Sequence, residues 1–500
     1  MKLSKKEFLK HRRQFGLGHL TTESFHPLSK DLSDIVKEDI EQAIEVLTQI
    51  DTQALTLLKD KYFEVFKLQQ QVQAVLKEGH KVFLCGCGAT GRLALSLERL
   101  YRDFFQSSQV CAFMAGGDYA LIKSVESFED SFEYGKRQLK ELGFSKNDLL
   151  ISITEGGETS FVIGAAEFAA DYSQEPPFFL YCNPDTELSS INRSQRILKN
   201  NKIKKINLSV GPMAISGSTR MQATTVQMIA TGFSLFYQHV NLEAFQKAFV
   251  QFIELLEHSS FHFIKDFIRH EYAVYQKNEI VTYRSDEKIA MAILTDTTER
   301  SPTFNLVGFE RDKTDEPSLV YLAVKDEQDP LKAWQRLLGR KPRCLDWQIP
   351  ERISLKDLYQ FDISEKTILR RNEIRENHVF DIYLENGFLL FMFGDLQRRI
   401  KIPQEADLFF IHLYLKLILN IHSTLLMGLL ERYQGNMMTY VSPSNFKLID
   451  RCFRYTKEIL KGQSIHISDD DLIDEIFKRV AIKKNSIVLD VLNSVKSQER

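Results

Sequence analysis

Short apolar runs alternate with helical patterns over the first half of the chain. The runs at residues 81–85, 110–114, 148–154 and 178–182 are largely apolar, and apolar residues recur at helical spacing between them. Such strands, separated by helices, are typical of a parallel sheet that is covered on both faces. Helical patterns also precede the first run and follow the last one. The first half therefore predicts an α/β unit.

The second half repeats this order of elements. A predicted strand at residues 289–294 leads into a polar loop at 295–303, further strands are expected at 319–324 and 389–393, and a long apolar helix at 408–430. Residue identity between the halves is negligible, so only the matching order predicts two diverged copies of one topology. The fold class is thus α/β, with two flavodoxin-like parallel-sheet domains packed as a pseudo-dimer. We expect an N-terminal segment with a helix at 1–55, sheet domains at 56–270 and 271–440, and a helical lid at 441–500.

Length and charge narrow the function classes. A chain of 500 residues is too long for one ordinary core, which agrees with two domains. Lys and Arg number 65 against 67 Asp and Glu, so the net charge is only −2. Charge therefore gives no reason to expect nucleic acid or an anionic membrane as a partner.

The cysteines and the apolar helix indicate in which cellular compartment the protein is expected. The six cysteines are scattered in apolar settings without zinc-ligand spacing, which is typical of reduced thiols in a cytoplasmic protein. No apolar segment of signal-peptide length follows the basic N-terminus. His412, Lys416, Asn420 and His422 interrupt the segment 408–430, so we interpret it as a buried helix and not as a membrane span.

A glycine-rich loop follows the first apolar run. Its sequence is Gly-Cys-Gly-Ala-Thr-Gly-Arg at residues 86–92, and a helical pattern comes directly after it. Glycines let the backbone approach an anion, and the first N–H groups of a helix point toward it without internal partners. From this stretch alone, a tight turn without a ligand is an equally good interpretation. The dinucleotide motif also fits nominally, but the expected acidic residue is missing, so a sugar phosphate is the better hypothesis.

Four more loops could carry chemistry. They lie at residues 115–118, 154–160, 210–222 and 298–302. The second of these, 154–160, offers glycines and hydroxyls at the end of a predicted strand, but Glu155 and Glu158 would repel a phosphate unless they point away. The sequence contains no Ser/His/Asp or Cys/His constellation and no metal-ligand spacing, so we expect neither cofactor nor metal.

Several of these motifs together resemble one family. They are residues 86–93, 115–118, 129–130, 182–184 and above all 211–221, with Thr-Thr-Glu at 21–23. They are similar to the N-acetylmuramic acid 6-phosphate etherases and the glucokinase regulatory proteins, which are built on sugar isomerase (SIS) domains. The segment 295–304 resembles the regulatory branch, in which a second SIS domain replaces the dimer partner of the etherase. The segments 420–424, 435–438 and 444–448 resemble the closing helix of that family and its lysine.

The resemblance implies a fructose-phosphate-type site. Its phosphate and nearby hydroxyls would be held by the loops after the strands, and Glu129 would face the sugar, where the etherases use it as an acid/base. Glu299 and Lys447 would complete the pocket from the second domain and the tail. The implied ligand-binding set is Ala89, Thr90, Glu129, Thr154, Glu155, Gly156, Ser216, Ser218, Thr219, Glu299 and Lys447.

The departures from the family decide between its branches. Etherases carry a second catalytic glutamate on the helix after the glycine loop, where this chain has Leu100, and Glu98 stands two residues early. Proton transfer needs groups positioned on the reacting atoms, so this loss argues against etherase chemistry. Met213 and Gln222 replace a Glu and a Lys of the family, and losing the lysine would weaken anion binding.

We therefore predict a regulatory protein of the glucokinase regulatory type rather than an enzyme. It would bind fructose 6-phosphate or fructose 1-phosphate, control a sugar kinase, and act as a monomer with an internal pseudo-dimer. The alternative is a lyase that releases lactate from N-acetylmuramic acid 6-phosphate, with Glu129 as a catalytic residue, or a related isomerase of sugar phosphates.

Overall fold

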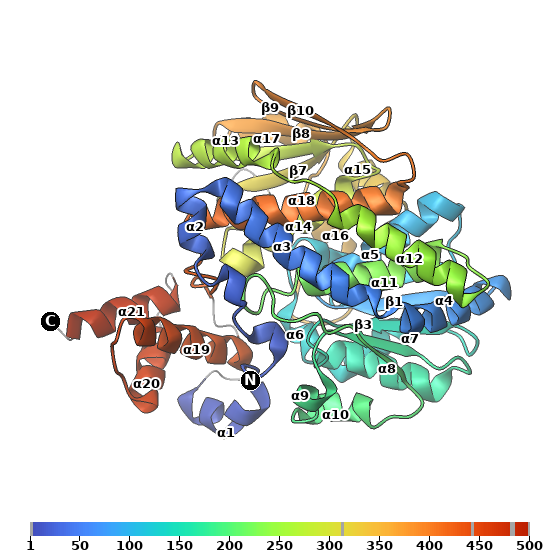
Figure 1. Ribbon diagram of the computed structural model, residues 1–500, viewed down its shortest axis with the longest axis horizontal. Coiled ribbons are helices and arrows are strands. Elements are labelled where there is room, and N and C mark those ends of the chain that lie inside the picture. Colours follow the sequence, from blue (N-terminus) through green and yellow to red (C-terminus); the bar gives the residue numbers. More distant parts are fainter. Residues whose placement is uncertain (1–3, 312–314, 442–444, 481–485, 499–500) are drawn as a thin grey trace.

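Two five-stranded sheets form the two halves of the molecule (Figure 1). The computed structural model describes residues 4–311, 315–441, 445–480 and 486–498. Ser444, which opens one of the motifs quoted above, lies outside these residues. The predicted α/β fold with two parallel-sheet domains is confirmed, whereas the predicted domain boundaries stay predictions.

The first sheet is entirely parallel, in the order β2-β1-β3-β4-β5. Its strands are β1 (Val82–Gly86), β2 (Val110–Met114), β3 (Leu149–Ile153), β4 (Phe178–Tyr181) and β5 (Lys204–Asn207). Every residue of β1 to β4 is buried, because helices cover both faces, and this explains their unbroken apolar runs. The helical elements of this half are α4 (Tyr62–Lys77), α5 (Ala89–Phe105), η3 (Asp118–Leu121), α6 (Glu126–Glu129), α7 (Phe132–Glu141), α8 (Ser160–Tyr172), α9 (Asp185–Leu188), α10 (Asn192–Leu198) and α11 (Gln222–Phe236).

The second sheet has the order β10-β9-β8-β6-β7. The strands β6 (Ile280–Ser285), β7 (Val320–Val324) and β8 (Asn377–Glu385) are parallel, and β9 (Phe388–Phe393) and β10 (Leu396–Lys401) continue as an antiparallel meander. The helices of this half are α12 (Leu242–Glu257), α13 (Ile264–Gln276), α14 (Ala290–Phe304), α15 (Pro330–Leu338), α16 (Leu355–Leu358), α17 (Lys366–Asn372) and α18 (Leu408–Leu429).

One predicted strand is wrong. Residues 289–294 open helix α14, and the predicted polar loop at 295–303 is the second half of the same helix. The threonines that suggested a loop satisfy their hydroxyls inside the helix: Thr295 donates to the carbonyl of Met291 and Thr298 to that of Leu294, four residues earlier. The strand of this unit is β6, immediately upstream. Burial on nearly all sides removes the helical periodicity that would have identified α14.

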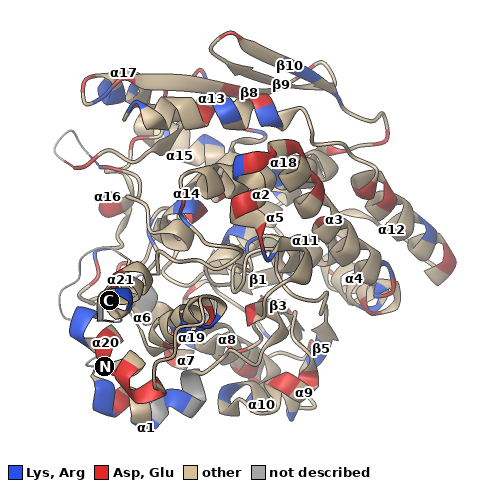
Figure 2. Cartoon of the chain, turned by 60° about the vertical axis from the view of Figure 1, so that its left-hand side comes forward, with Lys and Arg blue, Asp and Glu red and all other residues tan. Residues whose placement is uncertain are grey.

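Helices fill the space between the two sheets. Figure 1 shows α3 (Ile40–Lys59) and α18 running across the middle, and α5 of the first unit packs against α14 of the second. By length and composition α18 could cross a membrane, yet 94% of its most apolar window is buried inside the molecule. Basic and acidic residues are spread over both sheet units (Figure 2).

The two ends of the chain meet beside the first sheet. Helix α1 (Lys5–Phe15) lies with α19 (Phe446–Gly462), α20 (Asp469–Val480) and α21 (Ile487–Gln498) (Figure 1). Phe8 of α1 packs against Phe446 and Phe477. The short elements η1 (Thr21–Glu23), η2 (Pro27–Ser29) and α2 (Leu32–Glu38) lead from α1 to α3. The start of α19 is thereby held over the carboxyl ends of the first sheet.

Candidate functional site

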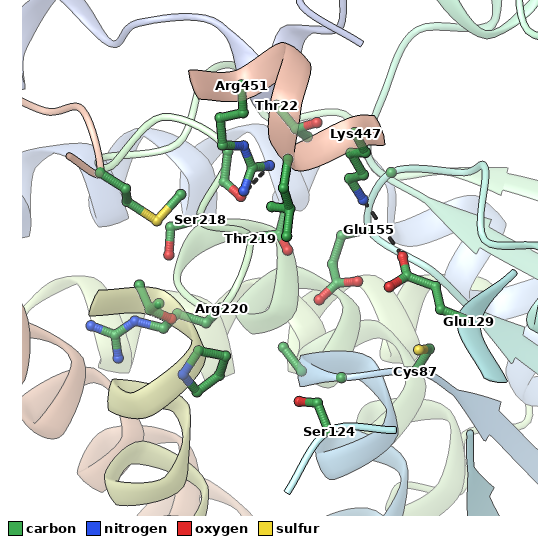
Figure 3. Close-up of a pocket in the computed structure, with 18 of the residues that line it drawn as sticks. Thr22, Cys87, Ser124, Glu129, Glu155, Ser218, Thr219, Arg220, Lys447 and Arg451 are labelled. Carbon is green, nitrogen blue, oxygen red and sulfur yellow. Dashed lines mark hydrogen bonds and ion pairs between the residues drawn. The ribbon is translucent and has the colours of Figure 1, made fainter. Parts of the chain in front are cut away.

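A cavity of about 440 Å³ lies at the carboxyl ends of the first sheet. Its floor comes from the loops after β1 and β3, and its walls come from η1, the loop at residues 217–220, the end of α14 and the start of α19 (Figure 3). Both sheet units and both ends of the chain therefore contribute. In parallel α/β sheets, this edge is where ligands bind.

The glycine loop after β1 is shaped for a close backbone approach. Gly88 has φ 55° and ψ −122°, which a residue with a side chain adopts only under strain, and it caps the first turn of α5. Cys87 donates its N–H to Thr90 Oγ1 (3.1 Å), and the Thr90 hydroxyl donates to the Cys87 carbonyl (2.9 Å). Cys87, Gly88 and Ala89 line the cavity, so the N-terminus of α5 is available to an anion.

Ion pairs connect the parts of the chain around the cavity. Arg92 of α5 binds Glu299 of α14 (2.7 Å), which joins the two sheet units at the cavity wall. Lys447 of α19 lies 3.1 Å from Glu158 and 3.6 Å from Glu129. These pairs attach the C-terminal helices to the first sheet at the cavity rim.

Glu158 does not repel a ligand as its sequence position suggested. Burial would raise the pKa of this carboxyl, but Lys447 and Arg193 outweigh burial and lower the pKa to about 2. Arg193 also donates to Glu158 Oε2 at 2.8 Å. Burial opposes the charge of Lys447, yet the carboxylates of Glu158 and Glu129 raise the pKa of this lysine. Both partners are therefore ionised at neutral pH, and their charges cancel.

Glu155 has a different environment. Its side chain is 8% exposed, and Thr224 Oγ1 donates to its carboxylate at 3.2 Å. Within the described part of the chain, no Lys or Arg comes within ion-pair distance of it. Burial, reinforced by the charge of Glu299, raises the pKa of Glu155 to about 7. Burial therefore favours the neutral, protonated form of this carboxyl.

Most of the predicted site residues come together in this cavity. Those that line it are Ala89, Glu129, Glu155, Gly156, Ser218, Thr219, Glu299 and Lys447. Thr90, Thr154 and Ser216 are buried behind the surface, where their hydroxyls stabilise the loops: Thr154 bonds Thr159, and Ser216 donates to the Glu23 carbonyl. Ligand contacts by these three residues stay predictions.

Several lining residues were not in the predicted set. Glu23, Cys87, Arg92, Ser124 and Arg451 also face the cavity. Arg451 binds Glu23 at 2.5 Å and so closes η1 onto α19. The Thr-Thr-Glu motif at residues 21–23 was a sequence signal for this wall, whereas no pattern in the sequence pairs it with Arg451.

Two of the unusual residues lie away from the cavity lining. Met213 is fully buried, and Gln222 donates to Asp51 (2.7 Å) and accepts from the N–H of Ala214 (3.0 Å). Gln222 therefore braces the loop from within.

The first helix of the second unit carries a glutamate at the same distance from the end of its strand. Leu100 follows Gly86, the last residue of β1, by fourteen residues, and Glu299 follows Ser285, the last residue of β6, by the same fourteen. Leu100 is 3% exposed and lies outside the cavity lining, whereas Glu299 lines the cavity. Glu98 binds Arg102, Arg340 and Arg343 instead. Of the two helices that follow the first strand of each unit, α5 and α14, only α14 thus supplies a carboxylate to the cavity.

A strap from the second unit supports the short helix α6, which carries Glu129. We use the name strap for residues 340–351. Its Trp347 stacks on Phe128 with ring centroids 5.4 Å apart and donates Nε1–H to Glu141 (2.6 Å). Glu351 accepts from the Ser127 hydroxyl (2.6 Å). The residues before Glu129 are therefore fixed by contacts from the other half of the chain.

One group among the described residues has the composition of a cation site. Glu279, Glu376 and His378 bring one ligand atom each within 4.8 Å of the others. His378 Nε2 already pairs with Glu279 at 2.7 Å. These residues lie at the amino ends of β6 and β8, away from the cavity, so they take no part in its chemistry.

Comparisons with known proteins relate part of the chain to a SIS domain and to etherases. The family described as glucokinase regulatory protein N-terminal SIS domain matches residues 65–170. N-acetylmuramic acid 6-phosphate etherase 2 of Vibrio cholerae is 30% identical over 215 residues, which cover 43% of this chain and 66% of that protein. N-acetylmuramic acid 6-phosphate etherase of Salmonella agona is 30% identical over 238 residues, which cover 45% of this chain and 75% of that protein. The chain belongs to the N-acetylmuramic acid 6-phosphate etherase family.

Membership of the etherase family corrects the functional prediction. The regulatory protein that controls a sugar kinase is contradicted, because the curated relatives are etherases. That prediction depended on Leu100 at the position of a catalytic glutamate; it placed Glu299 in the pocket, where the structure has it, but only as a ligand-binding residue. The match to the first of these etherases spans about two thirds of its length.

Among solved structures, tagatose-6-phosphate ketose/aldose isomerase from Escherichia coli is 11% identical with a TM-score of 0.44, over 80% of this chain and 97% of that one.

Proposed function

We propose that this protein is a lyase that cleaves the lactyl ether of a sugar phosphate such as N-acetylmuramic acid 6-phosphate. The observation that carries the proposal is that one cavity brings together Glu129 from the first unit and Glu299 from the second. The names of its relatives support this substrate class. One chain contains the whole cavity, so a monomer would suffice.

The reaction consists of an elimination and a hydration, and each of these steps needs two proton transfers. In the open-chain sugar the lactyl ether is attached to C3, and the proton on C2 is acidic because it is next to the C1 carbonyl. Removal of that proton and cleavage of the C3–O bond leave an unsaturated aldehyde, while the ether oxygen takes up a proton and departs as lactate. Water then adds across the double bond, which places its hydroxyl on C3 and its proton on C2. Glu129 and Glu299 are the carboxyl groups that we assign to these transfers.

The remaining lining groups would bind the substrate. The N-terminus of α5 and the hydroxyls of Ser218 and Thr219 offer donors to a phosphate. Arg92 holds the Glu299 carboxylate in place, and Lys447 does the same for Glu129. All six cysteines are free thiols, so we place the protein in the cytoplasm.

The test is lactate release from N-acetylmuramic acid 6-phosphate. The intact protein should release lactate, and Glu129→Gln should lower kcat by about 10² to 10⁴, the usual contribution of a general acid or base. Glu133→Gln on the neighbouring helix α7 is the matched control, because Glu133 lies outside the cavity lining, and it should leave kcat unchanged. Lack of lactate release by the folded protein, or equal rates for Glu129→Gln and wild type, would refute the proposal.

A further inference from the structure

The basic side chains that line the cavity are already committed to carboxylates. The pairs are Arg92 with Glu299, Lys447 with Glu158 and Glu129, Arg451 with Glu23, and Arg220 with Asp296. A phosphate that enters the cavity therefore meets no excess positive charge from these four residues. Glu155 adds a fifth lining carboxyl that lacks such a partner among the described residues. The protonation state of Glu155 thus decides whether a dianion is accepted.

Glu155 lies next to hydroxyl groups. Figure 3 shows its carboxyl near Thr219, with Ser218 on the same loop. Thr224 Oγ1 donates to Glu155 from α11 at 3.2 Å, and Gly156 follows it in the loop after β3. Hydroxyls and backbone N–H groups are neutral donors to phosphate oxygens. A protonated Glu155 would add one more donor, and an ionised one would add a repelling charge.

The groups that face Glu155 explain its tendency to hold a proton. Glu299 approaches from α14, Cys182 lies after β4, and Cys87 lies in the glycine loop. Thr219 and Thr224 favour the ionised form by donating to it, but burial and the charge of Glu299 outweigh them and raise the pKa of Glu155 to about 7. The proton is present below that pH and is lost above it.

We propose that the cavity binds the phosphate of its ligand together with one proton, which Glu155 holds. The proton comes from solvent, forms the O–H bond of the Glu155 carboxyl, and is shared with a phosphate oxygen as a hydrogen bond. No other bond is made or broken. The inference relies on the proposed function for its ligand class, a phosphosugar, but not for the lyase reaction.

The pH dependence of binding follows from two titrations. A phosphate monoester becomes a dianion above about pH 6. Glu155 loses its proton above about pH 7, and from there the affinity should fall about tenfold for each pH unit, because each binding event must then take up a proton. Affinity should be highest between these two values.

Titration calorimetry with N-acetylglucosamine 6-phosphate tests the proposal directly. This phosphosugar has no lactyl ether, so it binds without undergoing the lyase reaction. At pH 8, measurements in buffers of different ionisation enthalpy should show an uptake of about one proton per ligand bound by the wild-type protein. N-acetylglucosamine without phosphate is the ligand control and should show no such uptake.

The variant Glu155→Gln provides the second arm of the test. Gln keeps the size and the donor of a protonated Glu155 but cannot ionise, so proton uptake should vanish and affinity at pH 8.5 should exceed that of wild type at least tenfold. At pH 6 the two proteins should bind equally well. Glu133→Gln, which lies outside the cavity lining, should behave as wild type throughout.

The outcomes separate this inference from the proposed function. Binding by the wild type without proton uptake at pH 8, or absence of phosphosugar binding at pH 6.5, would overturn the inference, and neither result depends on how the variant folds. Proton-linked binding without lactate release from N-acetylmuramic acid 6-phosphate would support it and remove the lyase. Lactate release without proton-linked binding would do the reverse.

Discussion

The two sheet units differ most at the point where their sequences should match. In the first, β1 leads through three glycines into α5, and this loop lines the cavity. In the second, β6 leads through Asp286 and Lys288 into α14, and the Asp286 carboxylate accepts the N–H groups of Lys288 and Leu384. The Asp286 carboxylate thus occupies N–H groups of its own loop and of β8. The first unit thus contributes its glycine loop to the cavity, and the second unit contributes the C-terminal end of α14.

The helices that follow these two loops differ in the other direction: the helix of the second unit, and not that of the first, supplies a carboxylate to the cavity. Leu100 on α5 packs in the interior, and Glu299 on α14, which follows the end of its strand by the same number of residues, faces the cavity. A symmetric dimer would carry two loops and two carboxylates and hence two sites. A single chain with two copies needs only one of each, so the second set is free to change. The comparison teaches that a residue missing from one copy has to be sought in the other.

The sharpest test of this comparison changes Glu299 on α14 and Leu100 on α5 in separate variants. Glu299→Gln should lower kcat for lactate release by about 10² to 10⁴, because a neutral amide transfers no proton. Leu100→Met is the matched change on α5, keeps the core filled, and should alter kcat less than twofold. Equal losses in both variants would show that α5 and α14 contribute in the same way.

A second change compares backbone freedom in the two units. Gly88→Ala forces a side chain onto φ 55° in the glycine loop, and Gly387→Ala does so at φ 77° in the β8–β9 hairpin, with no atom within 4 Å of either new Cβ. Both should destabilise the fold by about 1–3 kcal/mol. Only Gly88→Ala should also weaken N-acetylglucosamine 6-phosphate binding, by about tenfold, as measured by calorimetry. Equal binding by the two variants would remove the anion-binding role of the loop.

The smallest expected effect concerns the strap. Trp347→Ala removes the ring that stacks on Phe128 next to Glu129, so kcat should fall several-fold while the affinity for N-acetylglucosamine 6-phosphate stays within twofold. Trp347→Phe keeps an aromatic ring and should restore most of kcat. A loss of affinity as large as the loss of kcat would mean that the strap shapes the whole cavity instead of positioning Glu129.

The fold was largely predictable from local pattern, and the site only partly. The buried apolar runs predict four strands of the first sheet, and the glycine loop predicts part of the cavity floor. The start of α14 was mistaken for a strand because residues 289–294 are apolar without periodicity. The meeting of Glu299 with Glu129 in one pocket was expected only from the family resemblance, because it depends on the packing of two distant units and no local pattern contains it. Likewise the unpaired state of Glu155 depends on where every neighbouring cation lies, and that is a property of three dimensions.

The stacking of Trp347 on Phe128 also provides an intrinsic fluorescence probe of the site. The chain has two tryptophans, and Trp334 is fully buried in the second unit, where its indole N–H donates to the Phe361 carbonyl. Trp347 lies at the rim of the first unit, with the Arg137 guanidinium 4.1 Å from its ring. A Trp334→Phe protein would therefore emit from a single indole that touches the residue before Glu129. Its emission would follow movements of that carboxylate during turnover, in real time and without an added label.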